Sequence, residues 1–422
     1  MEAEIYSKLL LTFGLVLLAA AIGGKIARFF KQPAVIGELL AGMIISPFAL
    51  GGFINDPVIL NFAVINGHFV EGGIAIPEFA PMQIIAEIAV IALLFIAGLE
   101  TDVRAFIRNG VTGGLVAVGG VVLPLLFGYV AAMYFFPDIG TVGWLFVGAV
   151  LTATSIGITV RILMDMGRFN SRESIIILVA AVVDDIIGLV ILSVVVSVAG
   201  SGEVNGLGIA VTALIGFAVW LALLAIGIFG HEFISKYILA PFKRSKTMPI
   251  LALILTVLIS YMVTLVDLHP VVGAYAAGLL FASTKEKEEI IEGARPVMLF
   301  LAPFFFAYLG MQVDLGSIWQ VIVPALVLLA LAVIGKIIGC YIPARLVGRL
   351  SHNGGMIVGV GMVPRGEVGL IVASAGLLAG AISRDIFGIA VVVSILTVFF
   401  VPTMLKPLFA RDAVLPAKPA KK

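Results

Sequence analysis

The sequence has 422 residues, of which 61% are hydrophobic and 12% are charged, and its mean hydropathy is +1.20. Soluble globular proteins carry about 25% charged residues, so the composition excludes that class and indicates a membrane protein. The net charge of +1 offers no basis for nucleic-acid binding, and the single cysteine, Cys340, excludes an internal disulfide bond.

Apolar runs of about 20 residues recur along the whole chain, which is the length that a helix needs to cross about 30 Å of hydrocarbon. Barrel strands would be about 10 residues long and alternating, so the pattern predicts an all-α polytopic membrane protein. Glu2 and Glu4 precede residues 9–24, and Lys25, Arg28 and Lys31 follow them, which is the reverse of a signal peptide, so residues 9–24 are interpreted as a retained first span. The thirteen predicted spans are 7–28, 33–50, 82–100, 110–136, 141–164, 174–199, 206–230, 247–266, 270–283, 294–312, 317–344, 354–381 and 385–409.

The positions of the basic residues support this segmentation. Loops on one side and the C-terminal tail hold all 26 Lys and Arg residues except Lys8 and Arg384 on the other side and Lys336 and Arg365 inside spans. Because cytoplasmic loops collect Lys and Arg, the N-terminus is predicted outside and the C-terminus in the cytoplasm. We expect residues 1–410 to form a single membrane transport domain, followed by a short cytoplasmic tail at 411–422.

The two halves of the chain contain similar segments at spacings of 236, 212 and 211 residues. The matched pairs are "GELLAG" at 37–42 with "GAYAAG" at 273–278, "AGLETD" at 97–102 with "LGMQVD" at 309–314, and "VGAVLTATSIG" at 147–157 with "VGVGMVPRGEV" at 358–368. Seven spans separate each pair, and an odd separation inverts the second copy in the bilayer. The pattern predicts six-span inverted-topology repeats at about 7–199 and 247–409 with a connector span at 206–230, an architecture typical of secondary transporters.

Ionisable side chains at membrane depth cost about 2.5–3.5 kcal/mol each on insertion scales and therefore point to function. Asp184 and Asp185 lie in an aliphatic run, and neighbouring helical residues point about 100° apart. One carboxylate can therefore take Lys336 as its counter-ion while the other faces a cavity and exchanges its proton. A structural bridge would need a single acid, so the second aspartate favours an ion-binding role.

Four other charged residues leave alternatives open. Arg365 and Glu367 either cross-link helices or act as charge partners of the ion site. Glu38 and Glu87 lie nearer span ends, where extension of the side chain to water is the favoured interpretation.

Two spans contain helix-interrupting residues. "LTATSIGIT" at 151–159 is rich in hydroxyl groups, and "MVPRGEVGL" at 362–370 contains a proline and glycines. Unwound backbone at the midplane offers carbonyl oxygens to a cation and exposes half-helix ends that carry partial charge. The expected broken-helix residues are Thr152, Ala153, Pro364 and Gly366, and the expected ion ligands are Asp184, Asp185, Thr154 and Ser155.

These motifs together resemble the monovalent cation/proton antiporter family, in the branch whose sodium/proton exchangers carry a paired aspartate. The residues that carry the resemblance are "VVDD" at 182–185, "TATS" at 152–155, "LLFIAGLETD" at 93–102, "FFFAYLGMQVD" at 304–314, "GKIIG" at 335–339 and "GMVPRGEVGL" at 361–370. The resemblance implies that Asp185 carries cation and proton in turn, that Asp184 is salt-bridged to Lys336, and that 152–155 is an unwound crossing segment. It also implies a homodimer whose protomers each combine a dimer domain with a mobile core that contains two crossed, broken helices.

The expected activity is exchange of sodium or lithium for protons across the cell's inner (plasma) membrane, by an electrogenic cycle and without a cofactor. Potassium-efflux members of the family carry a Gln-Asp pair and a soluble nucleotide-binding tail, and this sequence has neither. A potassium/proton antiporter and a sodium-coupled organic solute symporter remain alternatives. A channel is disfavoured by the intramembrane lysine, and an aspartyl protease is disfavoured because adjacent aspartates on one helix cannot share a proton across a water.

Overall fold

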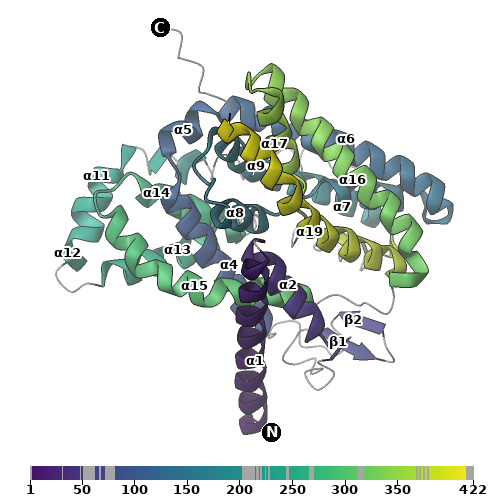
Figure 1. Cartoon of the computed structure of the whole chain (residues 1–422), viewed down its shortest axis with the longest axis horizontal. Helices are drawn as coiled ribbons and strands as arrows, with labels where there is room; N and C mark the ends of the chain where they lie inside the picture. Colours follow the sequence, from purple (N-terminus) through teal and green to yellow (C-terminus); the bar gives the residue numbers. More distant parts are fainter. Residues whose placement is uncertain are drawn as a thin grey trace.

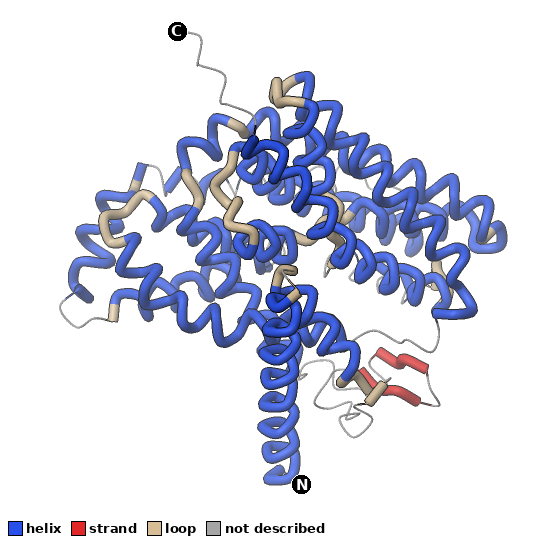
Figure 2. The backbone as a smooth tube through the Cα atoms, viewed as in Figure 1, coloured by secondary structure: helices blue, strands red, loops and turns tan. Residues whose placement is uncertain are grey.

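The computed structural model describes residues 2–30, 32–47, 49–50, 62–65, 68–71, 81–201, 229–243, 247–265, 270–311, 318–366 and 380–414, together with isolated residues within 214–226 and 369–377. Within this part of the chain nearly all regular structure is helical (Figure 2). Most of the helices form two bundles of six helices each.

The first bundle, here called the panel, contains six helices that pack on one another. They are α1 (Glu2–Phe29), α2 (Ala34–Ile44), α4 (Pro81–Glu100), α13 (Met248–Thr264), α14 (Pro270–Ala282) and α15 (Lys287–Met311). Two of its pairings join segments far apart in sequence, because α14 packs on α4 and α15 packs on α2 (Figure 1).

The second bundle, here called the core, also contains six helices. They are α6 (Gly110–Phe135), α7 (Gly140–Thr152), α9 (Arg172–Ser201), α16 (Ile318–Leu346), α17 (His352–Gly361) and α19 (Arg384–Val414). A further helix, α8 (Ile156–Asp165), contacts α9 of the core and both α2 and α4 of the panel, so it lies at the seam between the bundles (Figure 1).

Short elements connect these helices. They are α5 (Val103–Arg108), η2 (Pro137–Ile139), α11 (His231–Phe233), the π-helical turn η3 (Ile234–Leu239) and α12 (Ala240–Lys243). A small antiparallel hairpin, β1 (Phe62–Ile65) with β2 (His68–Glu71), pairs Phe62 with Glu71 and Ile65 with His68. The hairpin lies between the predicted spans 33–50 and 82–100, and β-branched and aromatic residues such as Val64, Ile65 and Phe69 favour strands.

The predicted spans agree with the helices to within a few residues at most positions. The main differences are that α2 ends at Ile44 rather than near 50, and that α15 begins at Lys287 rather than near 294. Among the described residues, seven helices are long and apolar enough to cross a membrane, and three shorter apolar helices accompany them. The predicted connector span 206–230 lies almost entirely outside the described residues, so the count of thirteen spans and the inverted repeats stay predictions.

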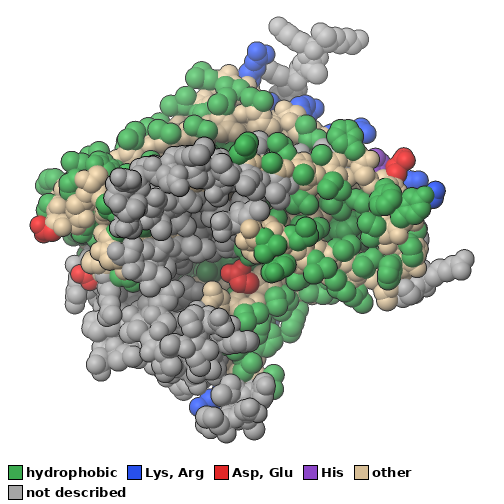
Figure 3. Space-filling view, turned by 180° about the vertical axis from the view of Figure 1, so that it is seen from behind, with side chains coloured by type: hydrophobic (Ala, Val, Ile, Leu, Met, Phe, Trp, Pro, Cys, Tyr) green, Lys and Arg blue, Asp and Glu red, His purple; other side chains and the backbone are tan. Residues whose placement is uncertain are grey.

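The surface matches the membrane class. Large aliphatic side chains are exposed on both bundles, including Leu18 (57%), Val130 (62%) and Ile254 (52%). Hydrophobic side chains cover much of the described surface that is visible in Figure 3. In water such a surface would be strongly unfavourable, whereas in lipid it has the same polarity as its surroundings.

Glycines allow the closest helix contacts in the panel. A Cβ atom added at Gly278 of α14 would lie 2.6 Å from the Cα of Gly98 on α4. A Cβ atom added at Gly42 of α2 would overlap the carbonyl of Ala307 on α15. Both positions belong to the "GELLAG" and "GAYAAG" segments. Small residues at these crossings let the backbones approach, which is how helices gain packing energy in lipid.

We predict that Gly278→Ala destabilises the protein by about 1–3 kcal/mol, because the added methyl group meets backbone atoms that cannot move aside. Gly114→Ala is the matched control, since no atom lies within 4 Å of a Cβ atom built at Gly114 in α6. Thermal unfolding in detergent checks the pair: Gly278→Ala should melt several degrees lower and Gly114→Ala should not. Equal melting temperatures for the two variants would contradict the packing argument.

Candidate functional site

The paired aspartates lie near the middle of α9. Asp184 is 2% exposed and Asp185 is 3% exposed, and aliphatic residues such as Val182 and Ile186 surround them on the same helix. Two adjacent carboxylates at this depth are costly unless charged or polar groups from other helices meet them.

Lys336 of α16 meets the first of the two aspartates. Its Nζ atom lies 2.9 Å from Oδ1 of Asp184, and it also donates a hydrogen bond of 2.6 Å to the carbonyl oxygen of Thr152. The Lys336 side chain is fully buried. Lys336 thus joins α16, α9 and the end of α7 at one point, as the sequence analysis expected for Lys336 and Asp184.

The backbone is interrupted after Thr152. Helix α7 ends there, Ala153 to Ser155 are not helical, and α8 begins at Ile156. Ser155 is the N-cap residue of α8, and its Oγ atom accepts a hydrogen bond of 3.3 Å from the backbone N–H of Ile158. Ser and Thr side chains compete with helical hydrogen bonds and favour caps, which explains why the hydroxyl-rich segment breaks the helix at this point.

A second interruption follows α17. That helix ends at Gly361, and Val363 to Gly366 are not helical. Pro364 has no N–H group to donate, and a Cβ atom at Gly366 would lie 2.8 Å from Oγ of Ser155. The two interruptions are therefore in contact.

Hydrogen bonds connect the two interrupted segments directly. The backbone N–H of Ser155 donates to the carbonyl oxygen of Pro364 at 2.8 Å. The hydroxyl of Thr154 donates to the carbonyl oxygen of Met362 at 3.2 Å, and that of Thr159 donates to the carbonyl oxygen of Gly361 at 3.1 Å. The crossing thus satisfies backbone groups that each broken helix leaves without an internal partner.

Arg365 lies in the interruption after α17 and donates hydrogen bonds to the backbone at the interruption after α7. Its Nη1 atom donates to the carbonyl oxygens of Ala153 at 2.9 Å and Val150 at 3.4 Å, and its Nη2 atom donates to that of Ala332 at 3.4 Å. The residue is 1% exposed. Arg365 therefore acts on carbonyl groups at the end of α7, and its expected companion, Glu367, lies outside the described residues.

Sequence reasoning missed the burial of Arg161 and wrongly expected Glu38 to reach water. Arg161 was assigned to a basic loop, but it lies in α8, is 7% exposed and makes an ion pair of 3.0 Å with Glu38. Glu38 is 2% exposed, so the expectation that it extends to water from a span end is wrong. Glu87 on α4 is half-buried. The signal for Arg161 was available, since a helix that restarts near Ser155 carries Arg161 only two turns from the break.

No group of three or more His, Cys, Asp or Glu side chains that could hold a resident metal occurs among the described residues. The Asp184 and Asp185 carboxylates and the Thr154 and Ser155 hydroxyls belong to buried residues, and their role as oxygen ligands of a transported sodium ion stays a prediction. Hard monovalent and divalent cations prefer such oxygen donors.

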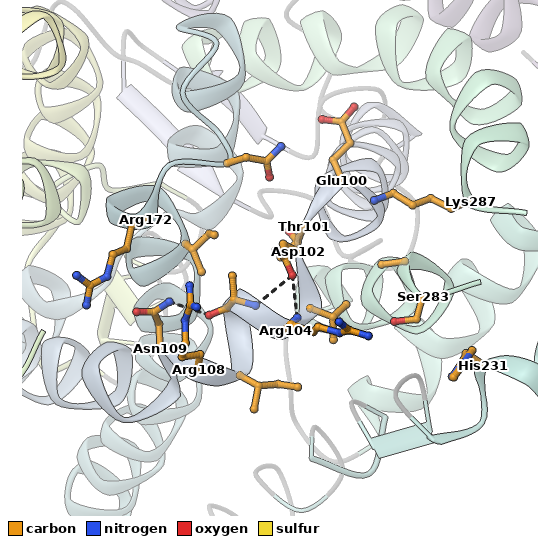
Figure 4. Close-up of a pocket in the computed structure, with 16 residues that line it drawn as sticks. Glu100, Thr101, Asp102, Arg104, Arg108, Asn109, Arg172, His231, Ser283 and Lys287 are labelled. Atoms are coloured by element: carbon orange, nitrogen blue, oxygen red, sulfur yellow. Dashed lines mark hydrogen bonds between the residues drawn. The ribbon is translucent and has the colours of Figure 1, made fainter. Parts of the chain in front are cut away.

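One cavity lies elsewhere, at the ends of α4, α9 and α15. It has a volume of about 760 Å³, and its lining includes Arg104, Arg108, Arg172 and Lys287 (Figure 4). Of its two carboxylates, Glu100 is paired with Arg295 and Asp102 accepts two backbone N–H groups of α5. A cavity with this excess of positive charge is a poor site for a cation, so the aspartate pair remains the candidate site.

Comparisons with known proteins show which family and fold the chain is similar to. Residues 14–411 match the family model described as sodium/hydrogen exchanger, transmembrane. The chain is 32% identical to the Na⁺/H⁺-K⁺ antiporter GerN of Bacillus cereus, covering 99% of this chain and 100% of that one. It is also 32% identical to the high-affinity Na⁺/H⁺ antiporter NhaS3 of Synechocystis, covering 97% of this chain and 92% of that one. The solved sodium proton antiporter MjNhaP1 of Methanocaldococcus jannaschii shares the fold, with a TM-score of 0.67, 17% identity and coverage of 97% and 98%.

We predict that Lys336→Met and Asp184→Asn each destabilise the protein by about 3–5 kcal/mol, because each leaves a buried partner without its counter-charge. The double variant should lose less than the sum of the two single variants, since it leaves no buried charge uncompensated. Thermal unfolding of the four proteins measures this coupling. Strictly additive losses would show that Lys336 and Asp184 do not stabilise one another.

Proposed function

Because the chain belongs to the sodium/hydrogen exchanger family, we propose that it is a secondary active antiporter that exchanges sodium or lithium for protons by alternating access. The observation that carries the proposal is the buried Asp184–Lys336 ion pair, with a second carboxylate, Asp185, on the next residue. The names of the two relatives at 32% identity support sodium as a substrate.

Asp185 is the proposed carrier of both ions. A carboxylate can hold either a proton or a cation but not both, so occupation by one excludes the other. Binding sodium then requires release of the proton, and this competition converts two separate binding reactions into exchange. Asp184 cannot serve equally, because Lys336 already neutralises it.

The crossed breaks supply the electrostatic surroundings. The end of α7 carries a partial negative charge, and Lys336 and Arg365 donate to its carbonyl oxygens at Thr152 and Ala153. The beginning of α8 carries a partial positive charge, which favours ionised carboxylates nearby. Hydroxyl groups of Thr154 and Ser155 complete the proposed ligand set for a cation that has lost its water.

The architecture supports alternating access. Two bundles with a seam between them suit a mechanism in which the core moves against the panel and carries the site from one side to the other. We propose that the N-terminus lies outside and the C-terminus in the cytoplasm of the plasma membrane, because basic residues gather on the C-terminal side. The protein is proposed to form a homodimer through the panel, as the resemblance implies. The exposed aliphatic face of the panel is compatible with that role.

Potassium is the second candidate substrate. It is favoured by the printed name of the Bacillus cereus relative, which includes K⁺ beside Na⁺. The same carboxylate site would bind either monovalent cation, and the difference would lie in the number and spacing of the oxygen ligands.

We predict that purified protein in liposomes will dissipate an imposed pH gradient when sodium or lithium is added, because inward cation movement is coupled to outward proton movement. A pH-sensitive dye inside the vesicles measures the effect, with potassium as a parallel arm. A gradient untouched by all three cations across pH 6 to 9, in protein that remains folded, rejects the antiporter function.

Asp185→Asn should abolish exchange, because the amide can neither take up a proton nor hold a cation by charge. The same dye assay measures it, and a normal melting temperature establishes that the variant is folded. Asp184→Asn is the comparison variant, in which some exchange can survive. Full exchange by Asp185→Asn would remove Asp185 from the role of carrier.

The cycle is predicted to be electrogenic. When the cation recruits Asp184, the ion pair to Lys336 opens and the lysine releases its own proton, so two protons move against one cation. Sodium-driven exchange should then respond to a potassium diffusion potential set with valinomycin. A rate and equilibrium indifferent to voltage would indicate a cycle of one proton, and Lys336→Ala that stays electrogenic would place the second charge elsewhere.

A further inference from the structure

A second buried ion cluster lies toward the far end of α8 from the broken segment. Nη2 of Arg161 is 3.0 Å from Oε1 of Glu38, and Nε of Arg161 is 3.2 Å from Oδ1 of Asp165, one turn further along α8. The side chains of Arg161 and Glu38 are 8% and 3% exposed, and that of Asp165 is 21% exposed. A buried guanidinium is strongly disfavoured without neutralising carboxylates, so the position of Arg161 depends on both partners.

Among the ion pairs between helices in the described residues, Glu38–Arg161 differs because it crosses the seam between the bundles. Glu38 belongs to α2, which packs on α1 and α15 of the panel. Arg161 belongs to α8, which is bonded to the core through the crossing with the segment after α17. By contrast, Lys336–Asp184 lies within the core and Glu100–Arg295 lies within the panel.

Movement of the ion site cannot leave this pair intact. Ser155 at the break and Arg161 lie six residues apart on one helix, a separation of about 9 Å along the axis. If the core carries the site across the membrane, α8 and Arg161 must shift with it, while Glu38 stays with the panel. Displacement by a single helical turn, about 5.4 Å, would separate a pair whose atoms are now 3.0 Å apart.

When Arg161 separates from Glu38, its buried positive charge still needs a carboxylate, and Asp165 supplies one. It lies on the same helix as Arg161, so the guanidinium keeps one counter-ion when it leaves Glu38. In the present arrangement Asp165 also reaches the panel, because its Oδ2 atom accepts a hydrogen bond of 3.0 Å from the backbone N–H of Ala34. The Asp165–Ala34 hydrogen bond and the Arg161–Glu38 ion pair both connect α8 to α2.

A cavity of about 470 Å³ opens at the same seam. Its lining includes Ala34 and Asp165, together with the basic residues Arg28, Arg168 and Lys406. The outer edge of the cluster is thus in contact with a polar space, which can solvate charged groups when the ties open.

From these contacts we infer that Glu38 and Arg161 form a latch that holds the panel and the core in the described arrangement, and that each exchange cycle requires the latch to open. The inference rests on the proposed antiporter function. It assigns a positioning role to Glu38, Arg161 and Asp165, since none of them is a proposed ion ligand.

The first test removes the charge of Glu38. Glu38→Gln should change the maximal exchange rate and the half-saturating sodium concentration, at least one of them by about fivefold or more, because loss of the latch shifts the population of the two arrangements. Glu38→Asp keeps the charge and should restore most of both values. Glu100→Gln is the matched control within the panel and should alter neither. Values equal to wild type in folded Glu38→Gln would overturn the latch.

The second test closes the seam covalently. Ala34→Cys with Asp165→Cys, in a Cys340→Ala background, places one thiol on each of the two residues that are joined by the hydrogen bond across the seam. Oxidation, or a short bifunctional thiol reagent, should stop exchange, and reduction should restore it. Glu100→Cys with Arg295→Cys serves as the control cross-link inside one bundle. Exchange by the Cys340→Ala parent, which keeps Asp165, establishes the antiporter function independently. Exchange by the cross-linked protein at the rate of the reduced double-cysteine protein would overturn the latch alone.

Discussion

The ion pair between Lys336 and Asp184 determines how the centre of this protein is built. An ammonium group with no exposed surface needs a carboxylate at the point where it lies, and Asp184 supplies one at 2.9 Å. Because the same Nζ atom donates to the carbonyl of Thr152, the pair also fixes the end of α7 beside α9. Three helices from distant parts of the sequence are thereby held together, with Asp185 next to the paired aspartate on α9.

The crossed breaks depend on the same balance of charge and hydrogen bonding. Non-helical backbone at membrane depth is tolerated only where protein or water satisfies its polar groups. Here each broken segment satisfies the other, through Ser155 and Pro364 in particular. Arg365 and Lys336 then occupy the negative end of α7 together, which leaves the carboxylates of α9 near positive partial and full charges.

The contacts inside the panel differ in kind from the contacts at the seam between the two bundles. Within the panel, backbones touch at glycines such as Gly98 and Gly278, and such contacts leave no room for sliding. At the seam, by contrast, α8 meets α2 through charged side chains, with a cavity close by. Ionic contacts can be exchanged for solvent or for another partner, whereas interlocked backbones cannot. This contrast suits rigid-body movement of one bundle against the other.

The sequence by itself determined the class of the protein, the approximate positions of most helices and the interruption at Thr152–Ser155, and it singled out Asp184, Asp185 and Lys336 as charges inside apolar spans. Each of these follows from local properties: runs of apolar residues, residues that cannot continue a helix, and charges that are costly in lipid wherever their partners are. Only the tertiary structure decided which charges meet. Glu38 and Arg161 are 123 residues apart, and their pairing depends on how deeply α8 restarts after the break and on which face of α2 it meets. Likewise, Arg365 binds the carbonyls of α7 because two interrupted segments cross, and no periodicity along the chain encodes a crossing between residues more than 200 positions apart.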